Sequence, residues 1–118
     1  MAPDFSPRTL SLAHDRQLTL GPKGVLMAIV NVTPDSFSDG GQFAGVDDVL
    51  AFSRAAVADG AEILDIGGES TRPGAAEVTA QEEQARILPV IEALSATTGA
   101  LISVDTYRAE TARLAVAA

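Results

Sequence analysis

Polar residues that could do chemistry follow three apolar, strand-like segments of the chain. Asn31 comes directly after the run VLMAIV, Thr71-Arg72-Pro73 follows EILDIGG, and Asp105 lies at the end of LISVDT. In a parallel α/β protein the carboxyl ends of the strands lie at one edge of the sheet, and ligands bind there. The pattern therefore predicts that these groups come together in one site.

Asn31 offers an amide oxygen, a hard neutral ligand for Mg²⁺, which usually takes one or two protein oxygens together with phosphates and water. The alternative is an asparagine that bonds its own backbone and anchors the loop, and the residue alone favours that alternative. Asp35 and Asp39 suit turns of the same loop, and the glycine pair Gly40-Gly41 allows the loop to move.

Phe37 and Arg72 are the residues of the two long loops that best suit a substrate. Phe37 either packs under its polar loop or covers a flat apolar substrate ring when the loop closes. Arg72 can bind a phosphate or carboxylate through two parallel hydrogen bonds, with Thr71 as a hydroxyl donor and Pro73 as a rigid turn beside it. A surface salt bridge is the competing interpretation of Arg72.

Asp65 and Asp105 stand within apolar strand sequence, where a buried carboxylate is costly unless it meets donors. Asp105 lies at the end of its strand. This position favours the interpretation that its carboxylate accepts paired N–H groups of a heterocycle over the interpretation that it makes a structural bond to nearby backbone. Asp65 lies deeper in its strand and favours a structural or supporting role. His14, the single histidine, is interpreted as a turn residue in water without a site role.

The composition limits the partners. The chain of 118 residues can bury one domain's core, and its 8 Lys and Arg against 16 Asp and Glu give a net charge of −8. Such a chain has no broad cationic field for nucleic acid. The absence of cysteine excludes disulfides and thiolate chemistry. With neither an apolar leader nor a membrane span, we expect a soluble cytoplasmic chain.

The apolar periodicity predicts an α/β fold made of one domain over 1–118. A hairpin over 9–20 precedes successive βα units over 25–59, 62–97 and 100–118. Right-handed crossovers place the three strands in parallel with the helices outside. The long loops follow strands and the short connections follow helices, which indicates one working edge.

The second predicted helix carries two local signals. Thr79 and Glu82 have the spacing of a capping box, in which the hydroxyl and the carboxylate satisfy opposite backbone donors. Pro89 lies in the helix interior, where it is expected to kink or divide the helix.

Two segments, LMAIVNVTPDSFSDGG and GAEILDIGGESTRPGA, resemble over their full length the signature segments of dihydropteroate synthases, the family of folate biosynthesis, and ISVDTYR resembles that family's third strand. The resemblance covers the chain from about Leu10. It implies a TIM (β/α)₈ barrel of the pterin-binding type, of which the amino-terminal hairpin and about three βα units are present. It also implies a transferase that condenses 6-hydroxymethyl-7,8-dihydropterin pyrophosphate with p-aminobenzoate to give 7,8-dihydropteroate and pyrophosphate.

The resemblance implies a role for each candidate residue. Asn31 corresponds to the contact with Mg²⁺ and pyrophosphate, Thr71 and Arg72 to binders of substrate, with Arg72 also catalytic, and Asp105 to the pterin carboxylate. The loop residues Phe37 and Pro73 correspond to the enclosure of p-aminobenzoate. The implied reaction is dissociative, because pyrophosphate leaves the pterin methylene with the help of Mg²⁺ before the aryl amine attacks. A homodimer is the implied assembly of the full-length enzyme.

A (β/α)₈ barrel typically needs about 250 residues. We therefore expect the 118-residue chain to be an amino-terminal portion that has no synthase activity alone and that aggregates, associates or stays loosely packed. One alternative is a pterin-binding methyltransferase module, which should lack the anion loop from Ser70 to Pro73. Another is a non-catalytic fragment or binding protein.

Overall fold

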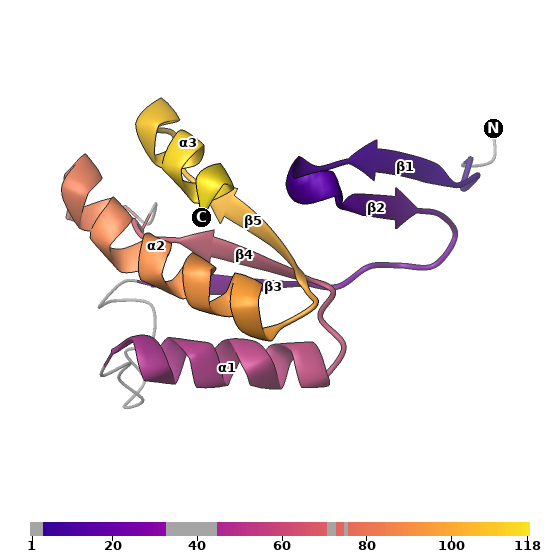
Figure 1. Ribbon diagram of the computed structural model, residues 1–118, viewed down its shortest axis with the longest axis horizontal. Coiled ribbons are helices and arrows are strands. Elements are labelled where there is room, and N and C mark those ends of the chain that lie inside the picture. Colours follow the sequence, from indigo (N-terminus) through magenta and orange to yellow (C-terminus); the bar gives the residue numbers. More distant parts are fainter. Residues whose placement is uncertain (1–3, 33–44, 71–72, 75) are drawn as a thin grey trace.

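The computed structural model describes residues 4–32, 45–70, 73–74 and 76–118. It contains an amino-terminal hairpin and a parallel sheet of three strands with helices packed on it (Figure 1). The α/β fold class predicted from the sequence is confirmed. The elements in chain order are β1 (Arg8–Ser11), the 3₁₀ turn η1 (Ala13–Asp15), β2 (Gln17–Leu20), β3 (Met27–Asn31), α1 (Val46–Ala58), β4 (Ile63–Gly67), α2 (Ala80–Thr97), β5 (Leu101–Asp105) and α3 (Ala109–Ala117).

The hairpin pairs β1 with β2 in antiparallel register, with Leu10 opposite Leu18. Its turn contains His14, which is exposed and has a positive φ of 59°. The His14 Nε2 group donates to the Val116 carbonyl oxygen at 2.7 Å, and the Arg16 guanidinium donates to the carbonyl oxygens of Gly99 at 2.6 Å and Ala100 at 3.1 Å. These bonds hold the hairpin turn against the start of β5 and the end of α3.

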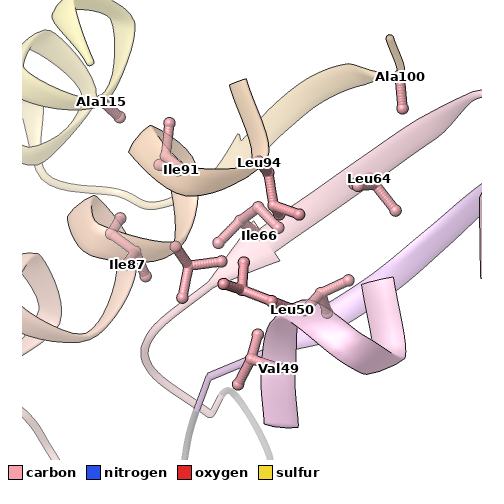
Figure 2. Close-up of a cluster of buried hydrophobic side chains, with 11 residues drawn as sticks. Val49, Leu50, Leu64, Ile66, Ile87, Ile91, Leu94, Ala100 and Ala115 are labelled. Carbon is pink, nitrogen blue, oxygen red and sulfur yellow. The ribbon is translucent and has the colours of Figure 1, made fainter. Parts of the chain in front are cut away.

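The parallel sheet has the strand order β3-β4-β5 and one covered face. Val30, Leu64 and Ile66 of β3 and β4 point to this face and are fully buried. Ala28 points to the same face and is partly buried. These side chains pack against apolar residues of α1 and α2 (Figure 2). Alternate strand residues point to opposite faces. Met27 and Ile29 therefore face the other side, where they are 50% and 62% exposed.

Helix α2 begins as expected but is not divided. The Glu82 backbone N–H donates to Thr79 Oγ1 at 3.1 Å, which is the forward bond of the capping box. The Glu82 carboxylate accepts from the Thr79 hydroxyl at 3.3 Å instead of from the Thr79 backbone. Of the two expected effects of Pro89, a kink or a division of the helix, the division does not occur, because α2 continues through Pro89. The kink stays a prediction. Pro89 and Ala85 are both exposed, so water can satisfy the Ala85 carbonyl that has lost its helical donor.

The carboxyl ends of the three parallel strands lie at the same edge of the sheet. The connections from β3 to α1 and from β4 to α2 both leave from this edge, which we call the carboxyl edge (Figure 1). The returns from helix to strand, at Asp59–Glu62 and Thr98–Ala100, are short. The edge predicted to carry the site is therefore the one from which the long connections depart.

Candidate functional site

Three residues form a row at the carboxyl edge, one from each parallel strand. Asn31 of β3 is paired with Gly67 of β4, and Gly67 is paired with Asp105 of β5. Residues paired in register on neighbouring strands point to the same face of a sheet. This row therefore lies on the face opposite the helices, above Ile29.

Gly67, at the centre of the row, has no side chain, and we call the position that its Cβ would take, between Asn31 and Asp105, the hollow. A Cβ atom at position 67 would lie 3.3 Å from Asn31 Oδ1 and 3.7 Å from Asp105 Cβ. Asn31 is half-buried and Asp105 is exposed. Within the described part of the chain, no side-chain hydrogen bond or ion pair occupies the amide of Asn31 or the carboxylate of Asp105. An amide oxygen and a carboxylate thus flank Gly67, and neither has a side-chain partner among the described residues.

A second polar pair lies one row below, on the same face. Ser103 is paired with Asp65 in the sheet, and its hydroxyl donates to Asp65 Oδ1 at 2.7 Å. The carboxylate that the sequence placed inside a strand has therefore found a donor on the neighbouring strand. This bond agrees with the supporting role favoured for Asp65.

A network of polar groups surrounds the guanidinium of Arg108, just beyond the carboxyl ends of β4 and β5. Its Nη1 donates to Glu69 Oε1 at 2.8 Å and lies 3.3 Å from Glu83 Oε1. Its Nη2 donates to the Val78 carbonyl oxygen at 2.6 Å and to the Tyr107 hydroxyl at 2.8 Å. We call Glu69, Val78, Glu83, Thr106 and Arg108 the Arg108 network. It joins β4, α2 and β5 just beyond the carboxyl edge.

Glu83 is the most buried member of this network, with 1% of its side chain exposed. Its Oε2 accepts from the Thr106 hydroxyl at 2.9 Å, whereas its Oε1 has no hydrogen-bond donor among the described residues and depends on the charge of Arg108. A buried carboxylate is costly unless a cation offsets it. Arg108 therefore compensates two carboxylates at once.

The interactions within the network shift the pKa values of Glu69 and Arg108. Desolvation, the largest influence on Glu69, raises the pKa of that carboxyl, but the hydrogen bonds from Arg108 and the Val78 N–H outweigh it, so the pKa lies below its ordinary value. Desolvation likewise lowers the pKa of Arg108, yet its hydrogen bond to Glu69 and the carboxylate of Glu83 beside it leave that pKa above the ordinary value. Both groups are consequently charged at neutral pH.

Gly68 allows α2 to approach the carboxyl edge. A Cβ at position 68 would lie 2.8 Å from Ile87 Cγ2 and 3.1 Å from the Glu83 carbonyl oxygen, so no side chain fits there. The Gly68 carbonyl oxygen accepts from Arg86 Nη1 at 2.9 Å. The glycine pair Gly67-Gly68 thus serves two surfaces, the hollow on one side and the packing of α2 on the other.

Some of the predicted site residues lie within the described part of the chain and others lie outside it. Asn31 and Asp105 come together around Gly67, and Pro73 lies exposed in a turn with Gly74, whose φ is +82°. Phe37, Thr71 and Arg72 lie outside the described residues, as do Asp35, Asp39 and Gly40-Gly41. In the described ranges no group of three or more His, Cys, Asp or Glu side chains could hold a metal ion.

Sequence reasoning missed the Arg108 network. One signal was available, because Glu83 lies four and eight residues before Ile87 and Ile91, on the buried stripe of α2. A charged residue in that register predicts a buried ion pair. Nothing local marks Glu69 or Arg108 as its partners, since they are brought together only by the tertiary fold.

A cavity of about 330 Å³ lies away from the row, between the hairpin turn and the surface formed by α2, β5 and α3. Its lining is mostly apolar and includes Leu12, Arg16 and Ile91, but neither Asn31 nor Asp105. The cavity and the row of Asn31, Gly67 and Asp105 are therefore separate places in the structure. None of the described helices is both long and apolar enough to cross a bilayer.

The family model and the similar proteins point to the same family. Residues 27–118 match the family model described as pterin binding enzyme. The dihydropteroate synthase of Bacillus subtilis (strain 168) is 52% identical over 101 residues, which are 86% of this chain and 35% of that protein. The dihydropteroate synthase of Streptococcus pyogenes serotype M1 is 53% identical over 93 residues, 79% of this chain and 35% of that protein.

Solved structures agree with these relatives. Xanthomonas albilineans dihydropteroate synthase with 4-aminobenzoic acid superposes with a TM-score of 0.83 at 49% identity, covering 95% of this chain and 40% of that one. Clostridium difficile dihydropteroate synthase in the presence of pteroic acid gives a TM-score of 0.72 at 47% identity, covering 80% of this chain and 36% of that one. The chain spans about a third of the length of the curated relatives it matches.

Proposed function

Since this chain belongs to the pterin-binding enzyme family, we propose that it supplies part of the active site of a dihydropteroate synthase. The reaction joins p-aminobenzoate to 6-hydroxymethyl-7,8-dihydropterin pyrophosphate and releases pyrophosphate. The observation that carries the proposal is the row of Asn31, Gly67 and Asp105, which borders a hollow at the carboxyl edge of parallel strands. The relatives described above are synthases, which favours this activity over a methyltransferase module.

Asp105 binds the pterin ring. Its carboxylate is exposed at the end of β5, and two oxygens in one plane suit the paired N–H groups of a 2-amino-4-oxo heterocycle. The Clostridium difficile relative was solved in the presence of pteroic acid, which contains such a ring. Gly67 beside it leaves room for a flat ring to lie against the backbone.

Asn31 contacts the Mg²⁺ and pyrophosphate end of the substrate. The chemistry of the donor fits this ion, because one neutral amide oxygen beside an open hollow leaves the remaining coordination positions to phosphate and water. When bound, Mg²⁺ supplies charge neutralisation on the departing pyrophosphate. The amide of Asn31 orients that group relative to the pterin held by Asp105.

The two long loops supply the remaining contacts. We assign Arg72 as the catalytic guanidinium that binds the anionic substrate groups, with Thr71 as a hydroxyl donor and Phe37 and Pro73 around p-aminobenzoate. The resemblance of the two signature segments supports these roles. The Xanthomonas albilineans relative was solved with 4-aminobenzoic acid, and it supports a p-aminobenzoate site in this chain's family.

These residues bind and orient two substrates, and none of them needs to act as a nucleophile. The bond between the pterin methylene carbon and the pyrophosphate oxygen breaks, the aryl amine nitrogen forms the new bond to that carbon, and the amine loses a proton. Positioning and exclusion of water are therefore the main tasks of the protein. We further propose a cytoplasmic homodimer that acts on small molecules, without nucleic acid or membrane partners, in line with the net charge of −8.

The test is synthase activity of the complete product of the gene that encodes this chain. Dihydropterin pyrophosphate and p-aminobenzoate are supplied with Mg²⁺, and both dihydropteroate and released pyrophosphate are measured. We expect both products in equal amounts. A purified, folded protein that forms neither product contradicts the proposal. Residues 1–118 alone are expected to give no turnover.

A further inference from the structure

The Arg108 guanidinium contacts both ends of the connection between β4 and α2. Its Nη1 donates to Glu69, which directly follows the glycine pair after β4, and its Nη2 donates to the carbonyl oxygen of Val78, just before α2. Glu69 Oε2 also accepts from the Val78 N–H at 3.4 Å. Glu69 and Val78, nine positions apart, are thus bonded to each other and to the Arg108 guanidinium.

The same arginine is fastened to the end of β5. Its backbone N–H donates to the Thr106 hydroxyl oxygen at 3.1 Å, and that hydroxyl donates to Glu83 Oε2 at 2.9 Å. Thr106 directly follows Asp105. The Arg108 network therefore joins both ends of the β4–α2 connection to Thr106, the residue that follows Asp105. The charged side chains that make these contacts are at most 18% exposed.

We propose that Arg108 is a positioning residue of this site. It holds the two ends of the β4–α2 connection, at Glu69 and Val78, beside the end of β5 that carries Asp105. Pro73 belongs to this connection, and Arg108 thereby sets the affinity for the aryl amine substrate. This inference rests on the proposed synthase function. A guanidinium suits the task because its planar fork reaches Glu69 and Val78 together, which a lysine ammonium cannot match in geometry.

The test compares R108M and R108K with R113M in the complete gene product. Arg113 lies on helix α3, which begins directly after Arg108, and pairs with Glu110 at 2.9 Å. Its side chain is 67% exposed, so R113M is a matched control. Initial rates are measured while each substrate is varied. We expect R108M to raise the KM for p-aminobenzoate roughly tenfold, with a smaller change in kcat, because a displaced connection weakens binding. R108K should lie between R108M and the wild type, and R113M should match the wild type.

The split between KM and kcat separates positioning from folding. A variant that only unfolds more readily loses apparent kcat, whereas the KM of its folded fraction is unchanged. An unchanged KM in both R108M and R108K therefore overturns the inference. If R108M does not fold, R108K and E69Q decide, because both keep the size of the side chain.

Hydrogen exchange at the Val78 amide gives a readout that needs no turnover. Positioning by Arg108 predicts faster exchange there in R108M and R108K than in R113M. Equal protection in the three variants overturns the inference. If the wild-type protein has no synthase activity, the proposed function is overturned, and the substrate assignment made here with it. If the wild type is active and the KM for p-aminobenzoate is unchanged in R108M and R108K, this inference alone is overturned.

Discussion

Asn31 and Asp105 lie on either side of Gly67, and Asn31 Oδ1 comes within 3.3 Å of the position that a Cβ of residue 67 would take. The two polar groups therefore share a hollow whose floor is backbone. A larger residue at this point of β4 would press on the Asn31 amide and, under the proposed function, would occupy space beside the ligand.

Replacing Gly67 with alanine should impair function more than folding. The new methyl group presses on the Asn31 amide and fills the hollow, so we expect kcat/KM to fall roughly tenfold or more. The melting temperature should change little, because the nearest atom belongs to a side chain that can move. Gly24 has no atom within 4 Å of its Cβ position, so G24A is the matched control. Equal kcat/KM in G67A and G24A would contradict the proposed hollow.

Removing the charge of Asp105 should weaken pterin binding. Each hydrogen bond to a charged group contributes about 1.5–3 kcal/mol, and Asn in its place keeps only one acceptor. We expect D105N to bind a dihydropterin roughly a hundredfold more weakly. Calorimetry on the complete protein measures this, with D59N at the exposed end of α1 as the control. An affinity equal to that of D59N would remove Asp105 from the pterin site.

A substitution at Gly68 should act on stability. In G68A the added carbon meets Ile87 Cγ2 at 2.8 Å and the Glu83 carbonyl oxygen at 3.1 Å. The latter is backbone and cannot rotate away, so α2 must shift. We expect a loss of about 1–3 kcal/mol in the free energy of unfolding, measured by urea denaturation against G24A. A stability as high as that of G24A would show that α2 is not held against β4 as described.

The ion pair of Glu69 with Arg108 should make stability depend on pH. The folded pKa of Glu69 lies below its ordinary value of 4.5, so its contribution is fully present above that value and is lost as the pH falls through the folded pKa. We expect the difference in melting temperature between the wild type and E69Q to stay constant at neutral pH and to shrink below pH 4.5.

The control for this prediction is E110Q, which removes the exposed partner of Arg113. Exposed ion pairs contribute little to stability, so E110Q should melt near the wild type. A difference between the wild type and E69Q that grows as the pH falls would contradict the assignment.

Local signals in the sequence predicted the strand ends and the start of α2. Apolar runs placed Asn31 and Asp105 at the ends of β3 and β5, and the spacing of Thr79 and Glu82 located the helix start. These features depend on neighbouring residues alone. Pro89 left two outcomes open, a kink or a division, and the sequence alone did not decide between them, because the effect of a proline depends on whether water can reach the freed carbonyl.

The Arg108 network could not be predicted in the same way. Glu69 and Arg108 are 39 residues apart, and only the pairing of β4 with β5 brings them together. Charged residues in loops are normally solvated, so nothing in the sequence around either residue indicates that these two form a pair. The position of Glu83 on the apolar stripe of α2 was the one local indication that a buried cation was needed.

The bond between Asp65 and Ser103 constrains whatever packs over the uncovered face of the sheet. Ser103 satisfies Asp65 Oδ1, and the second oxygen of that carboxylate still has lone pairs for a donor. A covering segment made only of aliphatic side chains would desolvate this charge without replacing its water. A segment that covers the face must therefore place an N–H, a hydroxyl or a cation next to Asp65. Only a partner with such a group in that position suits this surface.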